Sequence, residues 1–236
     1  MDIAWMVAGG AIGFVAGMAL RSTVFRLSVA SGEPDRTSCS RCATPLGVPL
    51  RIRCARCHGW FGTPLVLELA TAAVLALLLW RFAARADAAA FVFIGALGVA
   101  LAAIDIAVQR LPDRLTLLLY PGLIVLFGVA TVLTGQPANL LRALLGGLAL
   151  GGGYLVLALA SRGQLGGGDV KLAGGLGIAL GWLGWPTLVA GATLGFVLMG
   201  LVSLGLLLAR RITLQHAISF GPFMLGGALL AVLAGA

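Results

Sequence analysis

The chain has 236 residues, of which 60% are hydrophobic and only 10% charged, and its mean hydropathy is +1.07. This composition excludes a water-soluble globular domain and predicts an all-α, polytopic membrane helix bundle. The net charge of +8 requires no nucleic-acid partner, because arginines beside membrane helices face anionic lipid headgroups. The lipid bilayer is the partner that the composition indicates.

Apolar segments long enough to cross a hydrocarbon core of about 30 Å follow one another along the chain. The division is least defined over residues 181–187, where Gly-Trp-Leu-Gly-Trp-Pro can form a tight hairpin or a kink in one longer helix. The glycine-rich runs 146–153 and 174–177 predict close contacts between helices. We expect about eight transmembrane helices, near residues 3–20, 64–80, 88–104, 115–134, 139–160, 172–186, 187–209 and 218–236.

The arginines predict how the bundle is oriented. If the helices alternate in direction, all basic residues except Arg81, Arg85 and Arg142 fall on the side of the loop 21–63. The positive-inside rule then places this loop in the cytoplasm. The first apolar segment lacks a basic region before it, so we expect a retained helix and not a cleaved signal. Three parts follow: a first transmembrane helix (1–20), a cytoplasmic zinc-binding loop (21–63) and a membrane-embedded bundle (64–236).

All four cysteines lie in that loop, as the pairs Cys39/Cys42 and Cys54/Cys57. Two Cys-x-x-Cys pairs can supply four thiolates to one tetrahedral Zn²⁺. Disulfides or free thiols are the alternative, but a reducing cytosol disfavours disulfides. Four sulfur ligands close the coordination sphere, which predicts a structural zinc site. His58 could replace one ligand, although we interpret it as a polar neighbour in the loop.

Three aspartates lie at the ends of apolar runs, where a charge is costly unless it has a role or a partner. Asp105 ends the third run and Asp169 precedes the sixth, so both are expected at the same membrane boundary. Two carboxylates at one depth can share a proton, one acting as base toward water and the other as acid. Asp113 competes with Asp105 for this role, but its place after Pro112 is typical of a helix N-cap.

Asp169 belongs to the stretch Gly166-Gly167-Gly168-Asp169-Val170-Lys171, which contains the chain's single lysine. A flexible turn with a solvated acid and lysine is one interpretation, since glycine-rich turns are common between helices. The other is a site in which Asp169 and Lys171 are placed after three glycines for their chemistry.

Taken together, these segments resemble the type IV prepilin peptidases, a family of GxGD-type membrane aspartic proteases. The likeness covers almost the whole chain, and the ordered set of segments is far more specific than a single GxGD. It rests on Asp105 with residues 111–117, on 166–172, on the first-helix segment 17–27, on the two cysteine pairs, and on residues 64–68 and 220–223.

The resemblance implies an aspartic endopeptidase of the bacterial inner membrane, with its active site facing the cytoplasm. Its catalytic aspartates would be Asp105 and Asp169, and its substrates prepilins or pseudopilins, from which it removes a short basic leader. Gly166 and Gly168 would let the backbone approach an extended substrate, and Lys171 would act on Asp169, bind a substrate carbonyl or reach the lipid headgroups. A related GxGD peptidase with another substrate, such as preflagellin, is an alternative. A non-catalytic, zinc-stapled membrane scaffold or transporter component is a third hypothesis, from another class. The sequence does not define an oligomeric state.

The chain departs from the family at two places. Arg21 stands where the first-helix segment usually carries Asn, and the stretch between the cysteine pairs is shorter than in members that also methylate the new N-terminus. S-adenosylmethionine is therefore expected as a cofactor only if methylation is retained. Glu68 could belong to such a site, or could favour the dipole of the second helix. His216 is expected to be a polar loop residue.

Overall fold

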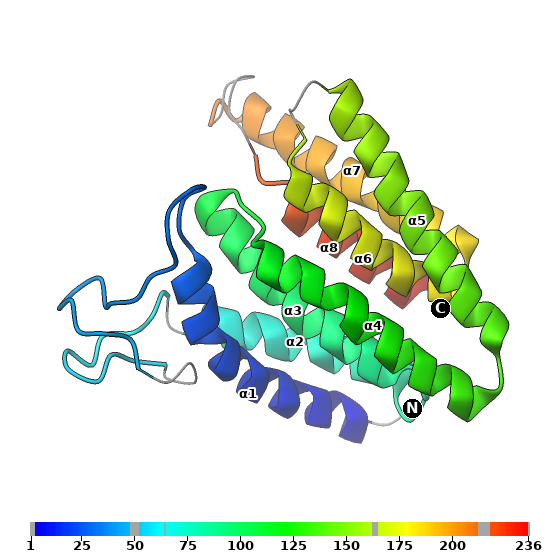
Figure 1. The fold of residues 1–236 in the computed structure, drawn as a ribbon, viewed down its shortest axis with the longest axis horizontal. Coiled ribbons are helices and arrows are strands. Elements are labelled where there is room, and N and C mark those ends of the chain that lie inside the picture. The colour runs from blue at the N-terminus through cyan, green and yellow to red at the C-terminus, as the bar shows by residue number, and fades with distance from the viewer. Residues whose placement is uncertain (1–2, 48–51, 64, 162–164, 212–217, 236) are drawn as a thin grey trace. The chain divides into compact units, whose positions relative to one another are not determined.

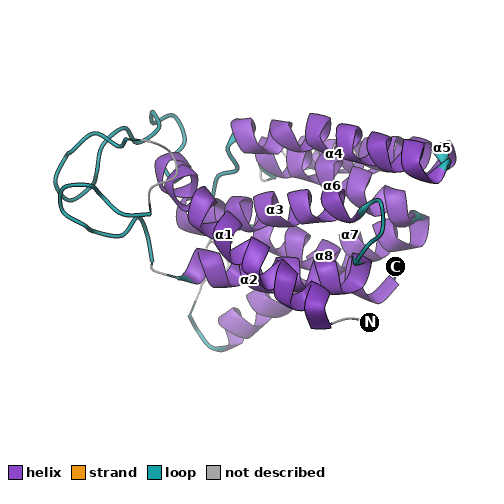
Figure 2. Cartoon of the chain, turned by 90° about the horizontal axis from the view of Figure 1, so that it is seen from below, coloured by secondary structure: helices purple, strands orange, loops and turns teal. Residues whose placement is uncertain are grey.

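The computed structural model describes residues 3–47, 52–63, 65–161, 165–211 and 218–235. Within these ranges the chain forms eight α-helices and no β-strand, only two isolated bridges in the loop after the first helix. Figure 2 shows this long loop beside an otherwise helical chain. The predicted all-α helix bundle is thus confirmed. The chain divides into two compact units, Met1–Pro112 and Asp113–Ala236.

The first unit contains three helices: α1 (Ile3–Leu27), α2 (Val66–Phe82) and α3 (Ala88–Val108). All three pack against one another, and Phe82 and Phe91 stack where α2 connects to α3, with ring centroids 4.0 Å apart. The first helix runs seven residues past the predicted end at residue 20, and the buried Arg21 lies within it. Residues 21–27, which the sequence assigned to the loop, therefore belong to α1.

The second unit contains α4 (Asp113–Thr134), α5 (Pro137–Ala160), α6 (Gly167–Leu183), α7 (Trp185–Leu208) and α8 (Gly221–Gly235). Helix α6 contacts each of the other four, and Figure 1 shows it next to α5. Every residue from Leu172 to Trp182 is buried. The residues at the beginning of α6 are therefore held by the centre of this unit.

Glycines set the closest helix contacts. A Cβ on Gly146 of α5 would lie 2.6 Å from the carbonyl oxygen of Gly177 in α6, so no larger residue fits there without a shift of the backbone. The predicted close contacts of the glycine-rich runs are confirmed. Gly184 separates α6 from α7 with φ 150°, a conformation that favours glycine. The ambiguous stretch at 181–187 is therefore a tight hairpin between two helices.

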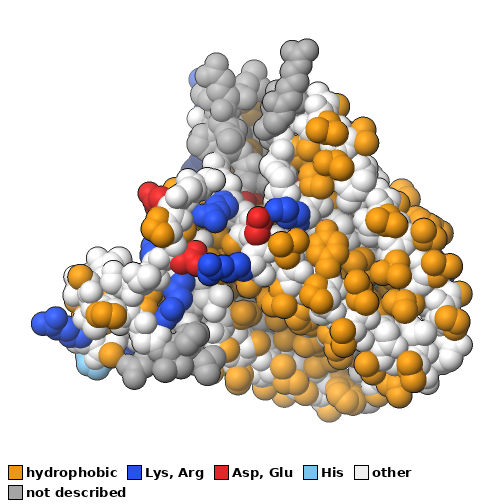
Figure 3. All heavy atoms as spheres, viewed as in Figure 1, with side chains coloured by type: hydrophobic (Ala, Val, Ile, Leu, Met, Phe, Trp, Pro, Cys, Tyr) orange, Lys and Arg blue, Asp and Glu red, His pale blue; other side chains and the backbone are white. Residues whose placement is uncertain are grey.

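The surface of the helices is apolar, as a bilayer requires. Figure 3 shows hydrophobic side chains over much of the helical surface. Among the described residues, five helices are long and apolar enough to cross a membrane: α1, α3, α4, α5 and α7. Helices α2, α6 and α8 are shorter, with 17, 17 and 15 residues. Together they make a multi-pass membrane protein.

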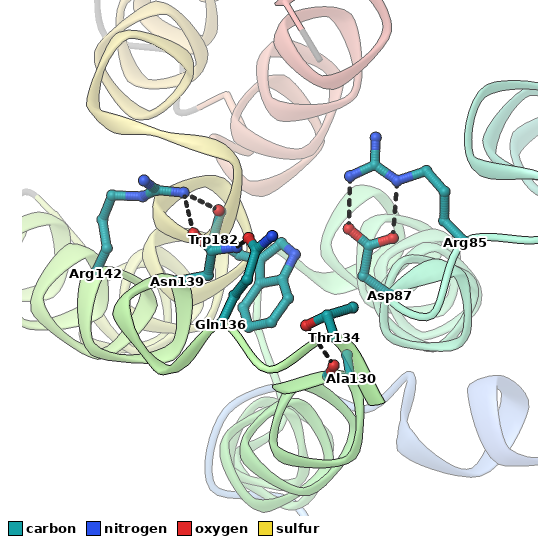
Figure 4. A network of polar contacts seen from close by, with 8 residues as sticks. All are labelled: Arg85, Asp87, Ala130, Thr134, Gln136, Asn139, Arg142 and Trp182. Carbon is teal, nitrogen blue, oxygen red and sulfur yellow. Dashed lines mark hydrogen bonds and ion pairs between the residues drawn. The ribbon is translucent and has the colours of Figure 1, made fainter. Parts of the chain in front are cut away.

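Two arginines that broke the predicted charge asymmetry have structural partners (Figure 4). Arg85 forms a bidentate ion pair with Asp87, at 3.0 and 2.8 Å. Arg142 donates to the carbonyls of Gly181 and Trp182 at the end of α6, at 2.8 and 2.5 Å. The last four carbonyls of an α-helix are not used by its own hydrogen-bond ladder and accept bonds from other groups. Local bonding therefore accounts for the positions of both arginines.

Candidate active site

Asp105 lies in the last turn of α3 and is only 5% exposed. Its backbone carbonyl accepts the N–H of Gln109 at 2.8 Å, and Gln109 takes the left-handed conformation that ends the helix. Leu111 and Pro112 follow, and a proline disfavours continuation of the helix before it. The carboxylate thus lies at the C-terminal end of an apolar helix, as the sequence predicted.

Asp169 lies in the first turn of α6 and is half-buried. The helix begins at Gly167, five residues before the predicted run, so Asp169 is a helical residue and not part of the preceding loop. Gly166 takes an extended conformation, and its carbonyl accepts the N–H of Asp169 at 3.0 Å. A Cβ on Gly166 would lie 3.3 Å from Asp169 Oδ2. Glycine at this position therefore keeps one side of the carboxylate open.

Gly168 and Lys171 belong to the same first turns of α6. Lys171 Nζ donates to Asp113 Oδ1 at 2.6 Å, and Asp113 is the first residue of α4. The hydroxyl of Tyr120, two turns further along α4, donates to the backbone carbonyl of Lys171 at 2.8 Å. The beginning of α6 is thus attached to α4 at two points. Lys171, whose role the sequence left open, is a partner of Asp113.

The two catalytic aspartates proposed from the sequence belong to different units, Asp105 to the first and Asp169 to the second. Their pairing stays a prediction. Asp105 lies at the C-terminal end of α3 and Asp169 in the N-terminal turn of α6. Asp113 is engaged by Lys171, which gives it a role other than that of the first catalytic carboxylate. His216 lies outside the described residues.

The four cysteines come together in the loop between α1 and α2. Their sulfur atoms all lie within 4.8 Å of one another, and the Sγ atoms of Cys39 and Cys57 are 3.8 Å apart. Those of Cys42 and Cys54 are 3.5 Å apart. Four thiolates about 2.3 Å from a tetrahedral ion lie roughly 3.8 Å from one another. The cluster therefore has the dimensions of a metal site.

The two cysteine pairs have matching backbone folds. Cys39 N–H bonds to Thr44, and Cys54 N–H bonds to Gly59, both at 2.9 Å. The residue after each second cysteine, Ala43 or His58, has φ 53°. His58 thus occupies a turn position, and the metal-binding group found among the described residues consists of the cysteines alone.

Thr44 also prepares a cysteine for metal binding. Cys42 forms hydrogen bonds with the side chain and the backbone of Thr44, and these lower the pKa of Cys42 to about 6. Because the thiolate is the form that binds a metal, this interaction favours the ligand state near neutral pH.

Arg21 and Glu68 form an ion pair that sequence reasoning missed. Arg21 Nε donates to Glu68 Oε1 at 2.6 Å and Nη2 donates to Oε2, while the two side chains are 2% and 1% exposed. Arg21 Nη1 also donates to the carbonyls of Phe61 and Thr63, at 2.9 and 2.8 Å. The pair therefore joins α1, α2 and the end of the cysteine loop.

Glycines in α1 bring this ion pair together. A Cβ on Gly17 would lie 2.6 Å from the Cα of Glu68, so the backbones of α1 and α2 almost touch there. Arg21 follows Gly17 by four residues and lies on the same face of the helix. Gly9 and Gly13 continue the face toward the N-terminus, each with a would-be Cβ 2.5 Å from an α2 carbonyl. The every-fourth spacing of these glycines was the signal in the sequence.

Comparison with known proteins finds relatives of the part of the chain that contains both aspartates. Residues 90–204, which include Asp105 and Asp169, match the type IV leader peptidase family. This part of the chain is similar to that family. The chain is 41% identical over 140 residues to the prepilin leader peptidase/N-methyltransferase of Dickeya chrysanthemi, covering 57% of this chain and 47% of the relative.

Other curated relatives agree. The prepilin leader peptidase/N-methyltransferase of Burkholderia pseudomallei is 34% identical over 171 residues, covering 69% of this chain and 52% of the relative. That of Aeromonas hydrophila is 34% identical over 145 residues, covering 58% and 46%. The chain thus spans about half the length of the curated relatives it matches. No solved structure matches it.

Proposed function

We propose that the protein is a membrane-embedded aspartic endopeptidase that removes the leader from type IV prepilins or pseudopilins, with Asp105 and Asp169 as its catalytic residues. The observation that carries this proposal is the position of Asp169. It lies in the first turn of a helix buried at the centre of its unit, directly after three glycines. The family match over residues 90–204 supplies the reaction.

Helix dipoles suggest how the two carboxylates divide the work. The N-terminal end of a helix favours negative charge and the C-terminal end disfavours it. Asp169 lies at an N-terminal end and Asp105 at a C-terminal end. We assign Asp169 as the base that removes a proton from the attacking water. Asp105, protonated, donates to the oxygen of the scissile carbonyl, and the two residues share one proton as a pair.

The residues around Asp169 would keep its carboxylate in position. Lys171 and Tyr120 attach the first turns of α6 to α4, which limits the movement of Asp169 when substrate binds. Gly166 leaves space beside the carboxylate, and Gly168 adds no side chain to the same turn. An extended peptide could approach there with its backbone.

The cysteine cluster is assigned to a structural Zn²⁺. Four sulfur ligands with tetrahedral dimensions leave no open position for a water or a substrate. The metal would fold the loop and support Phe61, which packs against Cys39 and Cys54. Because the positive-inside rule favours a cytoplasmic position for this arginine-rich loop, we propose that the loop and the active site face the cytoplasm at the bacterial inner membrane.

Methyl transfer from S-adenosylmethionine is a separate matter, because the relatives are also named N-methyltransferases. The sulfonium cation of this cofactor needs an anionic or electron-rich neighbour. Glu68 is engaged on both carboxylate oxygens by Arg21, and the cavity beside this pair contains a second arginine, Arg36. The described residues that line this cavity thus offer the sulfonium no free carboxylate, and we derive no methyl-transfer step.

Co-expression with a prepilin tests the proposed activity. Asp105→Asn and Asp169→Asn should each reduce cleavage by at least about 10²- to 10⁴-fold, the usual contribution of acid–base catalysis, while the protein still inserts in the membrane. Glu33→Gln, which removes an exposed acid from the loop, is the matched control. Retained cleavage in either aspartate variant would disprove the dyad. Cleavage of preflagellin instead of prepilin would favour the alternative peptidase.

A further inference from the structure

The first unit contains a cavity of about 560 Å³ at the loop end of its three helices. Apolar residues of α2 and α3 form one wall, including Val66, Ala70, Val99, Ala102 and Ile106. Asp105 is not among the residues that line it. The cavity is therefore a separate feature of this unit, and none of the proposed chemistry uses it.

The end of the cysteine loop, including Phe61, covers one side of the cavity, which we call its roof. Phe61 stacks on Phe25 of α1 with ring centroids 4.9 Å apart, and Phe61 is packed against Cys39 and Cys54. The guanidinium of Arg36 lies over the ring of Phe25, 4.9 Å from its centroid. Arg36 Nη1 also donates to the Phe25 carbonyl at 3.2 Å. Arg36 is thus held at the mouth of the cavity.

The charge of the cavity is positive. Among the described residues that line it are two arginines and no carboxylate. Arg21 is neutralised by Glu68, whereas Arg36 is exposed and keeps four of its five N–H donors beyond the bond to Phe25. Such a site attracts an anion and repels a cation.

The apolar wall is open on one side. Val66 is 61% exposed and Ile106 is 68% exposed, although both line the cavity. They belong to helices α2 and α3, and α3 is one of the helices able to cross a membrane. An apolar, open wall beneath an arginine fits a molecule with an anionic head and a hydrocarbon chain.

We propose that this cavity binds one anionic phospholipid, with its phosphate at Arg36 and an acyl chain along Val66, Ala102 and Ile106. Juxtamembrane arginines attract anionic headgroups, and burial of each methylene of the chain adds to the binding. The roof depends on the metal-binding loop through Phe61. The loop therefore has a function beyond its own fold: it closes a lipid site on the first unit.

Native mass spectrometry of the detergent-solubilised full chain tests this proposal with phosphatidylglycerol and phosphatidylcholine as probes. We expect phosphatidylglycerol to bind more tightly. Arg36→Gln should weaken it about fivefold, the contribution of one arginine near a lipid surface, and Arg36→Lys should restore most of the binding. Arg56→Gln, which removes an exposed charge from the same loop but does not line the cavity, should have little effect.

A second pair of variants tests the acyl chain. Ala102→Phe, which fills the cavity, should lower the affinity for phosphatidylglycerol but not for glycerol phosphate. Ile106→Ser makes the same test at an exposed position, where folding is not at risk. Equal losses in Arg36→Gln and Arg56→Gln, or equal binding of the two lipids, would overturn the proposal. An unchanged affinity for phosphatidylglycerol in both Ala102→Phe and Ile106→Ser would also overturn it, because only a site for a free anion would remain. Tighter binding of S-adenosylmethionine than of phosphatidylglycerol would overturn it as well.

Discussion

Two ion pairs connect helices within the two units, and they differ in how much water reaches them. Arg21 and Glu68 join α1 to α2 with side chains that are 2% and 1% exposed. Lys171 and Asp113 join α6 to α4, and their side chains are 38% and 61% exposed. The first pair also engages two backbone carbonyls. In the second pair, Lys171 lies two residues after Asp169 in the sequence.

The difference in burial implies different roles. Two charges that leave water lose their hydration, and either one is very costly if its partner is removed. An exposed pair contributes only about 0–1 kcal/mol, because water and salt screen it. The buried pair is therefore part of the fold of the first unit. The exposed pair can position Asp169 without being needed for folding.

Glu68→Gln should have the largest effect on stability. It leaves Arg21 buried without a counter-charge, and breaking a buried pair in this way costs about 3–5 kcal/mol. We expect a large decrease in the thermal unfolding temperature in detergent. Asp113→Asn, which removes an acid from the exposed pair, is the comparison variant and should lower stability by no more than about 1 kcal/mol.

The double variant Arg21→Met/Glu68→Leu separates the charge from the packing. Well-packed apolar side chains often replace a buried ion pair with no loss of stability. The double variant should therefore recover most of what Glu68→Gln loses. If the double variant is as unstable as Glu68→Gln, the hydrogen bonds from Arg21 to the carbonyls of Phe61 and Thr63 contribute more to stability than the pairing of Arg21 with Glu68 does.

Cys54→Ser should have an intermediate effect. Loss of the metal would release Phe61 and with it the carbonyl that accepts from Arg21. A hydrogen bond to a charged group contributes about 1.5–3 kcal/mol, and we expect a decrease of that size. Metal content by mass spectrometry and thermal unfolding measure the two effects, with Ser40→Ala, in the turn between Cys39 and Cys42, as control. Metal loss with unchanged stability would show that the loop and the ion pair are independent.

Much of the fold could be predicted from the sequence because lipid imposes simple rules. The helices follow the apolar runs, and the cysteine site is formed by two short local pairs whose spacing alone indicates it. The Arg21–Glu68 pair could not be found in this way. Its members are 47 residues apart, and only the packing of Gly17 against α2 brings them together. The beginning of α6 was placed too late because Gly166, Gly168 and Asp169 are typical of a loop.

Asp105 and Asp169 show the limit of the same reasoning at the candidate site. The sequence predicted each at the end of an apolar run, and the helices place each there. Their pairing depends on contacts between residues far apart in the chain, which hydrophobic patterns do not encode. The link from Lys171 to Asp113 is of the same kind, since 58 residues separate the two.

Lys171→Gln should have the smallest effect on stability, about 1 kcal/mol or less. Because the pair is exposed, the difference between wild type and variant should shrink further at 0.5 M salt, where screening is strong. Lys171→Arg keeps the charge and is the matched control. The kcat of cleavage should fall by more than this small loss of stability explains. The reason is that the helix of Asp169 loses one of its two attachments to α4. A loss of stability comparable to that of Glu68→Gln would show that the exposed pair also maintains the fold, and the distinction between the two pairs would fail.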